Sequence, residues 1–110
     1  MSFKFKINKD AIPYRTTLTI SQRNYIFDFK YNSYDGRIYV DLYDSSGNVI
    51  YYSEPIIFGM PLWYNKIVDE QGNFKEEFPQ AYIIPMSNDK SYKKIDYSNI
   101  DNIVMLVKEF

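Results

Sequence analysis

The sequence contains no cysteine and no histidine among its 110 residues. Without cysteine, the chain has neither a disulfide framework nor a thiolate metal site. Without histidine, it lacks the usual general base, the commonest metal ligand and the side chain that titrates near neutral pH. Its four glycines form no Gly-rich phosphate loop, and no serine lies in a Gly-x-Ser-x-Gly motif. We therefore expect no enzyme activity, no catalytic residue, no metal and no cofactor.

Long apolar runs and strong net charge are also missing. The longest apolar run covers residues 103–107, far short of the roughly 20 residues that span a bilayer. Residues 1–10 alternate apolar and charged side chains and do not resemble a signal peptide. A net charge of −1 provides no positive field for a nucleic acid. We expect a soluble protein made in a cytoplasm, with no membrane or nucleic acid as partner.

Aromatic residues are abundant instead: twelve Tyr, eight Phe and one Trp make up 19% of the chain. Aromatic rings pack well on a pleated surface and so favour strands. Between Tyr25 and Tyr31, every second residue is aromatic, and Asp28 and Lys30 alternate with them. This period of two is typical of a strand with one buried face.

Repeated segments of this kind, separated by turn signals such as Asp35–Gly36, predict an antiparallel sheet that closes on itself or packs on another. The length predicts one domain, residues 1–110. We predict an all-β fold, a small antiparallel β-barrel or β-sandwich of about six to eight strands. The predicted strands cover residues 2–7, 15–21, 24–31, 37–43, 49–52, 55–58, 81–86 and 102–108.

Three segments have distinct patterns. Residues 54–63 contain two prolines and a glycine among bulky apolar side chains, so we expect a short strand and then a buried bend with one helical turn from Pro61. The apolar run 103–107 indicates a strand buried on both faces. Residues 68–77 and 88–101 are long polar connections, where we expect contacts with partners.

The aspartates of residues 31–50 do not form a site in the sequence. Asp41 and Asp44 are three positions apart on a predicted strand, so they face opposite sides of it. The stretch from Asp44 to Gly47 lacks the alternating Asp pattern and the distal Glu of a calcium loop. We interpret it as a turn that Asp44 caps. A carboxylate pair across a cleft, as in a glycosidase, has no support from the spacing.

The tyrosines allow two interpretations. Tyr39, Tyr43, Tyr51 and Tyr52 could form an aromatic platform that binds a sugar, in a carbohydrate-binding β-sandwich module. They could equally cover a half-buried sheet or a protein–protein interface, in which Tyr is enriched. We favour the interface. Its candidate residues are Tyr39, Tyr43, Tyr51, Tyr52, Trp63 and Phe74.

The order of motifs along the chain resembles the baseplate plug family of tailed bacteriophages. Ile12-Pro13 opens the pattern, and an aromatic strand that ends in Tyr31-Asn32 follows. The closest match is Ile38-Tyr-Val-Asp-Leu-Tyr-Asp44, with Gly47 in the turn after it. Further motifs are Pro55-Ile-Ile-Phe-Gly-Met-Pro-Leu62, Ala81-Tyr-Ile-Ile84 and Met105-Leu-Val107. Together they span residues 12–107.

The resemblance implies a structural protein of the virion that closes or organises the distal end of the tail tube at the baseplate hub. Its partners would be other tail and hub proteins, with multiple copies in a symmetric assembly. Residues at turns and strand ends would be scaffold rather than a site; these are Asn32, Asp41, Asp44, Gly47 and Gly59.

Overall fold

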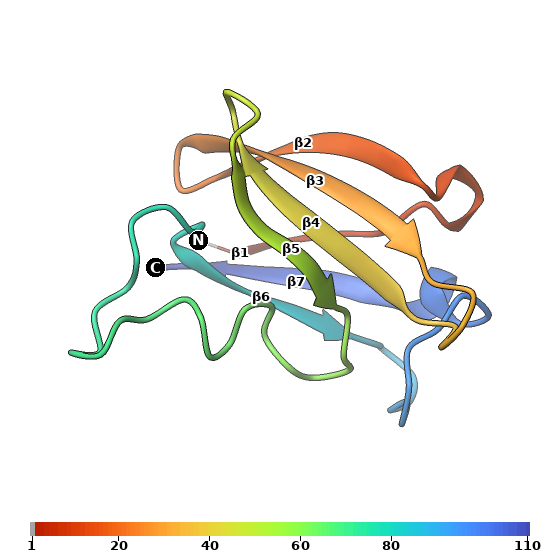
Figure 1. The fold of residues 1–110 in the computed structure, drawn as a ribbon. Helices are drawn as coiled ribbons and strands as arrows, with labels where there is room; N and C mark the ends of the chain where they lie inside the picture. The colour runs from red at the N-terminus through yellow and green to blue at the C-terminus, as the bar shows by residue number, and fades with distance from the viewer. Residues whose placement is uncertain (1) are drawn as a thin grey trace.

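The computed structural model describes residues 2–110 and contains two antiparallel β-sheets that pack face to face (Figure 1). The four-stranded sheet has the order β2-β3-β4-β5, and the three-stranded sheet has the order β1-β7-β6. Two short 3₁₀ helices, η1 (Lys9–Ala11) and η2 (Ile100–Asn102), lie in the connections. The strands are β1 (Ser2–Phe5), β2 (Tyr14–Ile20), β3 (Arg23–Tyr31), β4 (Ile38–Asp44), β5 (Val49–Pro55), β6 (Ala81–Met86) and β7 (Val104–Glu109).

The predicted all-β class is confirmed, and the two sheets stay separate, so the fold is a sandwich rather than a barrel. The prediction of a separate strand at residues 55–58 is wrong. There β5 ends at Pro55, the Ile56 N–H donates to Ile38 O at 3.0 Å, and the chain then crosses to the other sheet. Gly59, with a φ of 73°, makes this crossing and donates its N–H to Pro85 O at 2.8 Å.

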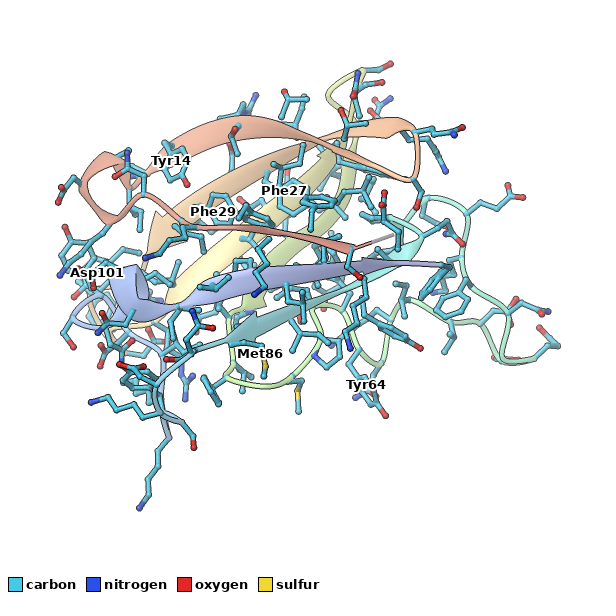
Figure 2. The ribbon with its side chains drawn as sticks, turned by 180° about the vertical axis from the view of Figure 1, so that it is seen from behind. Tyr14, Phe27, Phe29, Tyr64, Met86 and Asp101 are labelled. Atoms are coloured by element: carbon cyan, nitrogen blue, oxygen red, sulfur yellow. The ribbon has the colours of Figure 1, made fainter. Side chains whose placement is uncertain are left out.

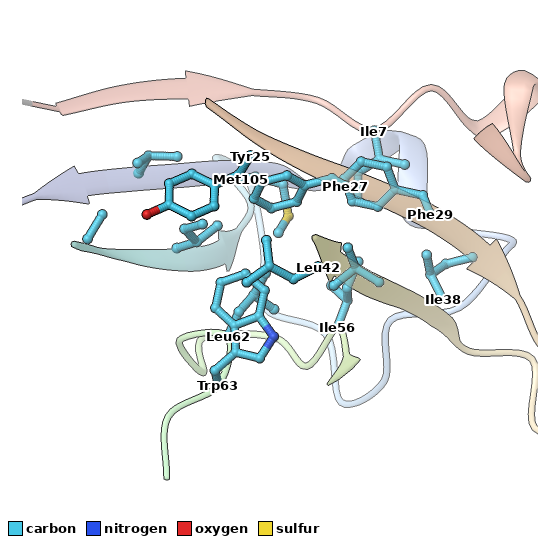
Figure 3. Packing of buried hydrophobic residues seen from close by; sticks show 14 of the residues in the cluster. Ile7, Tyr25, Phe27, Phe29, Ile38, Leu42, Ile56, Leu62, Trp63 and Met105 are labelled. Carbon is cyan, nitrogen blue, oxygen red and sulfur yellow. The ribbon is translucent and has the colours of Figure 1, made fainter. Parts of the chain in front are cut away.

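The core lies between the sheets and is built around the aromatic row of β3 (Figure 3). Phe27 is fully buried, and its ring centroid lies 6.1 Å from those of Phe29 and Trp63. From the facing sheet, Met105 and Val107 of β7 fill the opposite side and are also fully buried. Burial of such side chains is the largest favourable term in the stability of a small domain.

The apolar run in β7 is buried on one face only, so the prediction of burial on both faces is wrong. Met105 and Val107 point into the core, whereas Val104 and Leu106 are half-buried on the outside of the three-stranded sheet. The reason is that no second layer of strands covers that face among residues 2–110, so these two side chains stay partly exposed.

We expect Phe27→Ala to lower the free energy of unfolding by about 3–5 kcal/mol, because it removes a fully buried ring and leaves a cavity among three other rings. Urea denaturation followed by tryptophan fluorescence measures the change. As a control, Tyr34→Ala removes a side chain that is 99% exposed and is expected to stay within about 0.5 kcal/mol of the parent. Similar losses for both variants would contradict the assignment of the core.

Candidate functional site

The outer face of the four-stranded sheet carries paired charges. Arg15, Asp28 and Asp41 are neighbours across β2, β3 and β4. The guanidinium of Arg15 donates from Nε and Nη2 to the two carboxylate oxygens of Asp28 at 2.7 and 2.8 Å. These hydrogen bonds and the charge of Arg15 hold the pKa of Asp28 below its usual range. With Lys30 Nζ 3.0 Å from Asp41 Oδ2, both carboxylates of this face have a cationic partner.

Asp41 also holds an irregularity in β5. Its side chain is almost buried, and its Oδ1 accepts a hydrogen bond from the Ser53 N–H at 2.7 Å. Ser53 has a φ of 59°, and the register between β4 and β5 shifts on both sides of Leu42. A left-handed conformation is unfavourable for serine, and a hydrogen bond to a charged acceptor offsets part of that cost. Asp41 therefore stabilises the irregular backbone of β5 at Ser53.

The four tyrosines of the predicted platform do not share a plane. Tyr43 and Tyr52 lie on the outer face with centroids 6.1 Å apart, but their rings stand at 85°. The guanidinium of Arg15 lies over Tyr43 at 5.0 Å. Tyr51 packs with Phe78 instead, at 6.4 Å between centroids. A sugar platform needs flat, accessible rings, and this arrangement does not provide one.

Tyr39 lies at one end of the same face, beside an open hollow of about 530 Å³. Its O–H donates to Asp35 Oδ2, which raises the pKa of Tyr39 and lowers that of Asp35. The hydroxyl is thus engaged within the loop that follows β3. The hollow is lined by Lys30, Tyr31, Asn32, Ser33, Tyr34, Tyr39 and Ser53.

Asn32 and Asp44 each bond to the backbone of the turn that they begin. Asn32 Oδ1 accepts from the Tyr34 N–H at 2.8 Å. Asp44 Oδ1 accepts from the N–H groups of Ser46 and Asn48, both at 2.9 Å. Side chains of Asn and Asp commonly stabilise turns in this way.

Gly47 and Gly59 have φ angles of 87° and 73°, which side-chain-bearing residues rarely adopt. Gly47 completes the turn between β4 and β5 with an N–H bond to Asp44 O at 3.0 Å. Both glycines therefore shape the backbone.

Trp63 lies in the core rather than on the surface, with only 1% of its area exposed. Its backbone N–H, not its indole N–H, donates to Glu54 Oε2 at 2.8 Å, and its backbone has a φ of 58°. Burial raises the pKa of Glu54, although the Trp63 N–H and the charge of Lys66 act in the opposite direction. The ring is thus part of the core that binds residues 56–80 to the sandwich. One helical turn follows, closed by the Ile67 N–H and Trp63 O at 3.0 Å.

Phe74 belongs to an aromatic cluster on the three-stranded side of the molecule. Its ring centroid lies 4.3 Å from that of Phe110 and 6.1 Å from that of Tyr82. Tyr82 and Phe110 are exposed by 37% and 56% and were not among the predicted interface residues. The sequence contained a signal for this apolar surface, because Tyr82, Ile84 and Met86 occupy every outward position of β6.

Two features were sought in the described part of the chain: a cluster of metal-binding side chains and a helix that could span a membrane. Among residues 2–110, no group of three or more acidic, His or Cys side chains could hold a metal ion. No helix within the same residues is long and apolar enough to cross a bilayer.

Comparison with known families identifies the family of the chain. The family described as Cyanophage baseplate Pam3 plug gp18 matches residues 3–108. The chain belongs to this family. No match was found among curated proteins.

Membership makes the chain a phage baseplate plug protein. It implies a place in the tail baseplate of the virion and association with other baseplate components. The resemblance inferred from the ordered motifs is thereby confirmed, over slightly more of the chain than residues 12–107.

The Arg15–Asp28 pair predicts a pH dependence of stability. The pKa of Asp28 in the folded protein lies below the ordinary value of 3.8, so folding favours the ionised carboxylate. The stabilisation, at most about 1 kcal/mol for a pair at the surface, is fully present above pH 3.8. It is lost as the pH falls through the lower pKa of the folded state.

We therefore expect Asp28→Asn to destabilise the protein at pH 7 and to have a smaller effect near pH 2.5. Urea denaturation of parent and variant at both pH values measures this difference. Asp101→Asn is the control, because within residues 2–110 the carboxylate of Asp101 makes no hydrogen bond or salt bridge. An Asp28→Asn effect that is equal at both pH values would contradict the pairing.

Proposed function

We propose that this plug protein closes or organises the distal end of the tail tube at the baseplate hub, and that its role is mechanical rather than catalytic. The observation that carries the proposal is the family match across residues 3–108, which assigns nearly the whole chain to a baseplate plug. On this proposal the chain acts as one domain, is made in the host cytoplasm and enters the virion with other hub proteins in a symmetric assembly.

The side chains support a mechanical role. The two salt bridges of the described chain, Arg15–Asp28 and Lys30–Asp41, join strands of one sheet. The side chain of Asp44 bonds to a turn, and that of Glu54 to a buried backbone N–H. Each of these carboxylates has a structural partner, which leaves it poorly suited to act as a general acid or base.

The fold also suits a closing element. Two packed sheets resist deformation because their interior is close-packed, and a plug has to withstand the pressure or contents of a tube until it is displaced. The tyrosine-rich surface is typical of proteins that bury much of their exterior against neighbours.

The first test is quantitative mass spectrometry of purified virions and isolated tails. We expect the protein in both, at a low and fixed copy number relative to the tube protein. Its absence from particles would contradict the proposal.

The second test addresses position. Tails made by a phage whose reading frame for this protein is interrupted should either fail to complete the baseplate or lack density at the distal end of the tube in electron cryomicroscopy. Re-expression of the parent chain from a plasmid is the control and should restore the density. Unchanged density in the interrupted phage would place the protein elsewhere in the baseplate.

A further inference from the structure

The outer face of the three-stranded sheet is largely apolar, whereas the outer face of the four-stranded sheet carries paired charges. In the strand register, Ile84 of β6, Leu106 of β7 and Lys4 of β1 lie side by side in one row. The row on one side of it contains Met86 and Val104. On the other side, the row contains Tyr82, Lys108 and Ser2. The face thus changes from apolar on β6 and at Val104 and Leu106 of β7 to basic at Lys108 of β7 and Lys4 of β1.

We propose that this face binds a different baseplate protein, whose contact surface is apolar at its centre and carries carboxylates along one border. The proposal rests on the proposed function, since it names the surface through which the plug is held. We call the surface the β6–β7 patch. It consists of Tyr82, Ile84, Met86, Val104 and Leu106.

The exposed side chains support this choice. Of ten large apolar side chains exposed among residues 2–110, five lie on β6, on the segment beside it, or at the chain end that packs on it. Gly59 and Leu62 donate N–H bonds to Pro85 O and Ile83 O, which places Met60 and Tyr64 along the edge of β6 that faces away from β7. Figure 2 shows Met86 and Tyr64 on the same border of the molecule. The five are Met60, Tyr64, Tyr82, Met86 and Phe110.

The composition of β7 leads to the same surface. Val104 and Leu106 continue the apolar run through the outward positions of a central strand. Strands that are apolar on both faces are normally covered on both faces. Here the chain itself covers one face, and a partner on the other would complete the pattern. Contiguous exposed apolar surface of this kind marks interaction sites.

Tyr82, at one end of the patch, packs against other aromatic rings. The ring of Phe110 packs against Phe74 and Tyr82 at 4.3 and 5.1 Å between centroids. Aromatic side chains held in place lose little further entropy on binding and are enriched among the residues that dominate binding energy.

The charges distinguish a different protein from a second copy. The outward positions of β1, β7 and β6 include Lys4 and Lys108 and no Asp or Glu. Neither lysine takes part in the salt bridges of residues 2–110. Two copies meeting through this face would gather four lysines without a carboxylate to pair with them. Like charges across an interface are unfavourable, whereas a border of carboxylates would complement them.

The test uses assembled tails. The phage whose reading frame for this protein is interrupted is grown in cells that carry the chain on a plasmid, with a photo-crosslinking amino acid at position 82 or 86. Tails are purified after irradiation, and mass spectrometry identifies the cross-linked peptides. We expect both positions to cross-link to one other baseplate protein, at a segment that contains Asp or Glu. Position 17, an exposed Thr on the outer face of the other sheet, is the control and should not reach that segment.

A charge reversal provides the second measurement. We expect Lys108→Glu to lower the copy number in tails by about tenfold or more, because it opposes the carboxylates of the partner. Lys93→Glu, an equal change of charge at an exposed loop position, should leave the copy number unchanged. Circular dichroism of both isolated variants checks that they fold.

Three outcomes would each overturn the inference and leave the proposed function standing. The first is cross-links to a second copy of this chain, and the second is a plug that is present in tails at the parent's copy number but forms no cross-links. The third is normal incorporation of Lys108→Glu into tails. Absence of the parent chain from tails would overturn the proposed function as well, so the two failures are distinguishable.

Discussion

The row of aromatic rings on β3 is the contact on which the two sheets depend. Tyr25, Phe27 and Phe29 project from the four-stranded sheet to meet Met105 and Val107 of the other, and all five are at most 1% exposed. Seven strands divided between two sheets offer little interior, so a few large rings supply much of the buried area. This packing sets the position of one sheet on the other, and therefore the position of the two outer faces described above.

The same constraint explains the long stretch between β5 and β6. A sandwich of this size leaves part of its core uncovered, and residues 56–80 cover it with Leu62, Trp63, Ile67 and Phe78. Trp63 has a left-handed backbone conformation, and its backbone N–H donates a hydrogen bond to the buried carboxylate of Glu54. Burial of that carboxylate is unfavourable, as its raised pKa indicates. The arrangement persists because Trp63 is fully packed between the rings of Phe27 and Phe78.

The two outer faces of the sandwich are physically unlike. The four-stranded sheet satisfies its own charges through Arg15–Asp28 and Lys30–Asp41 and needs no ligand to do so. The three-stranded sheet exposes apolar rows bordered by lysines. An asymmetry of this kind suits a plug that is held by its neighbours on one face, where apolar area supplies affinity and the charged border supplies orientation.

The sequence by itself determined the all-β class, the strand alternation, the turns at Asn32 and Asp44, and membership of the plug family, because these depend on local periodicity and on the order of motifs. Only the tertiary structure decided that Trp63 is buried, that Tyr51 faces away from Tyr43, and that the chain leaves the sheet after Pro55. It also decided that one face of β7 stays open. Those outcomes depend on which strands become neighbours and on how many layers cover each face. A period of two in the sequence shows which residues share a face of a strand, but it does not show what packs against that face.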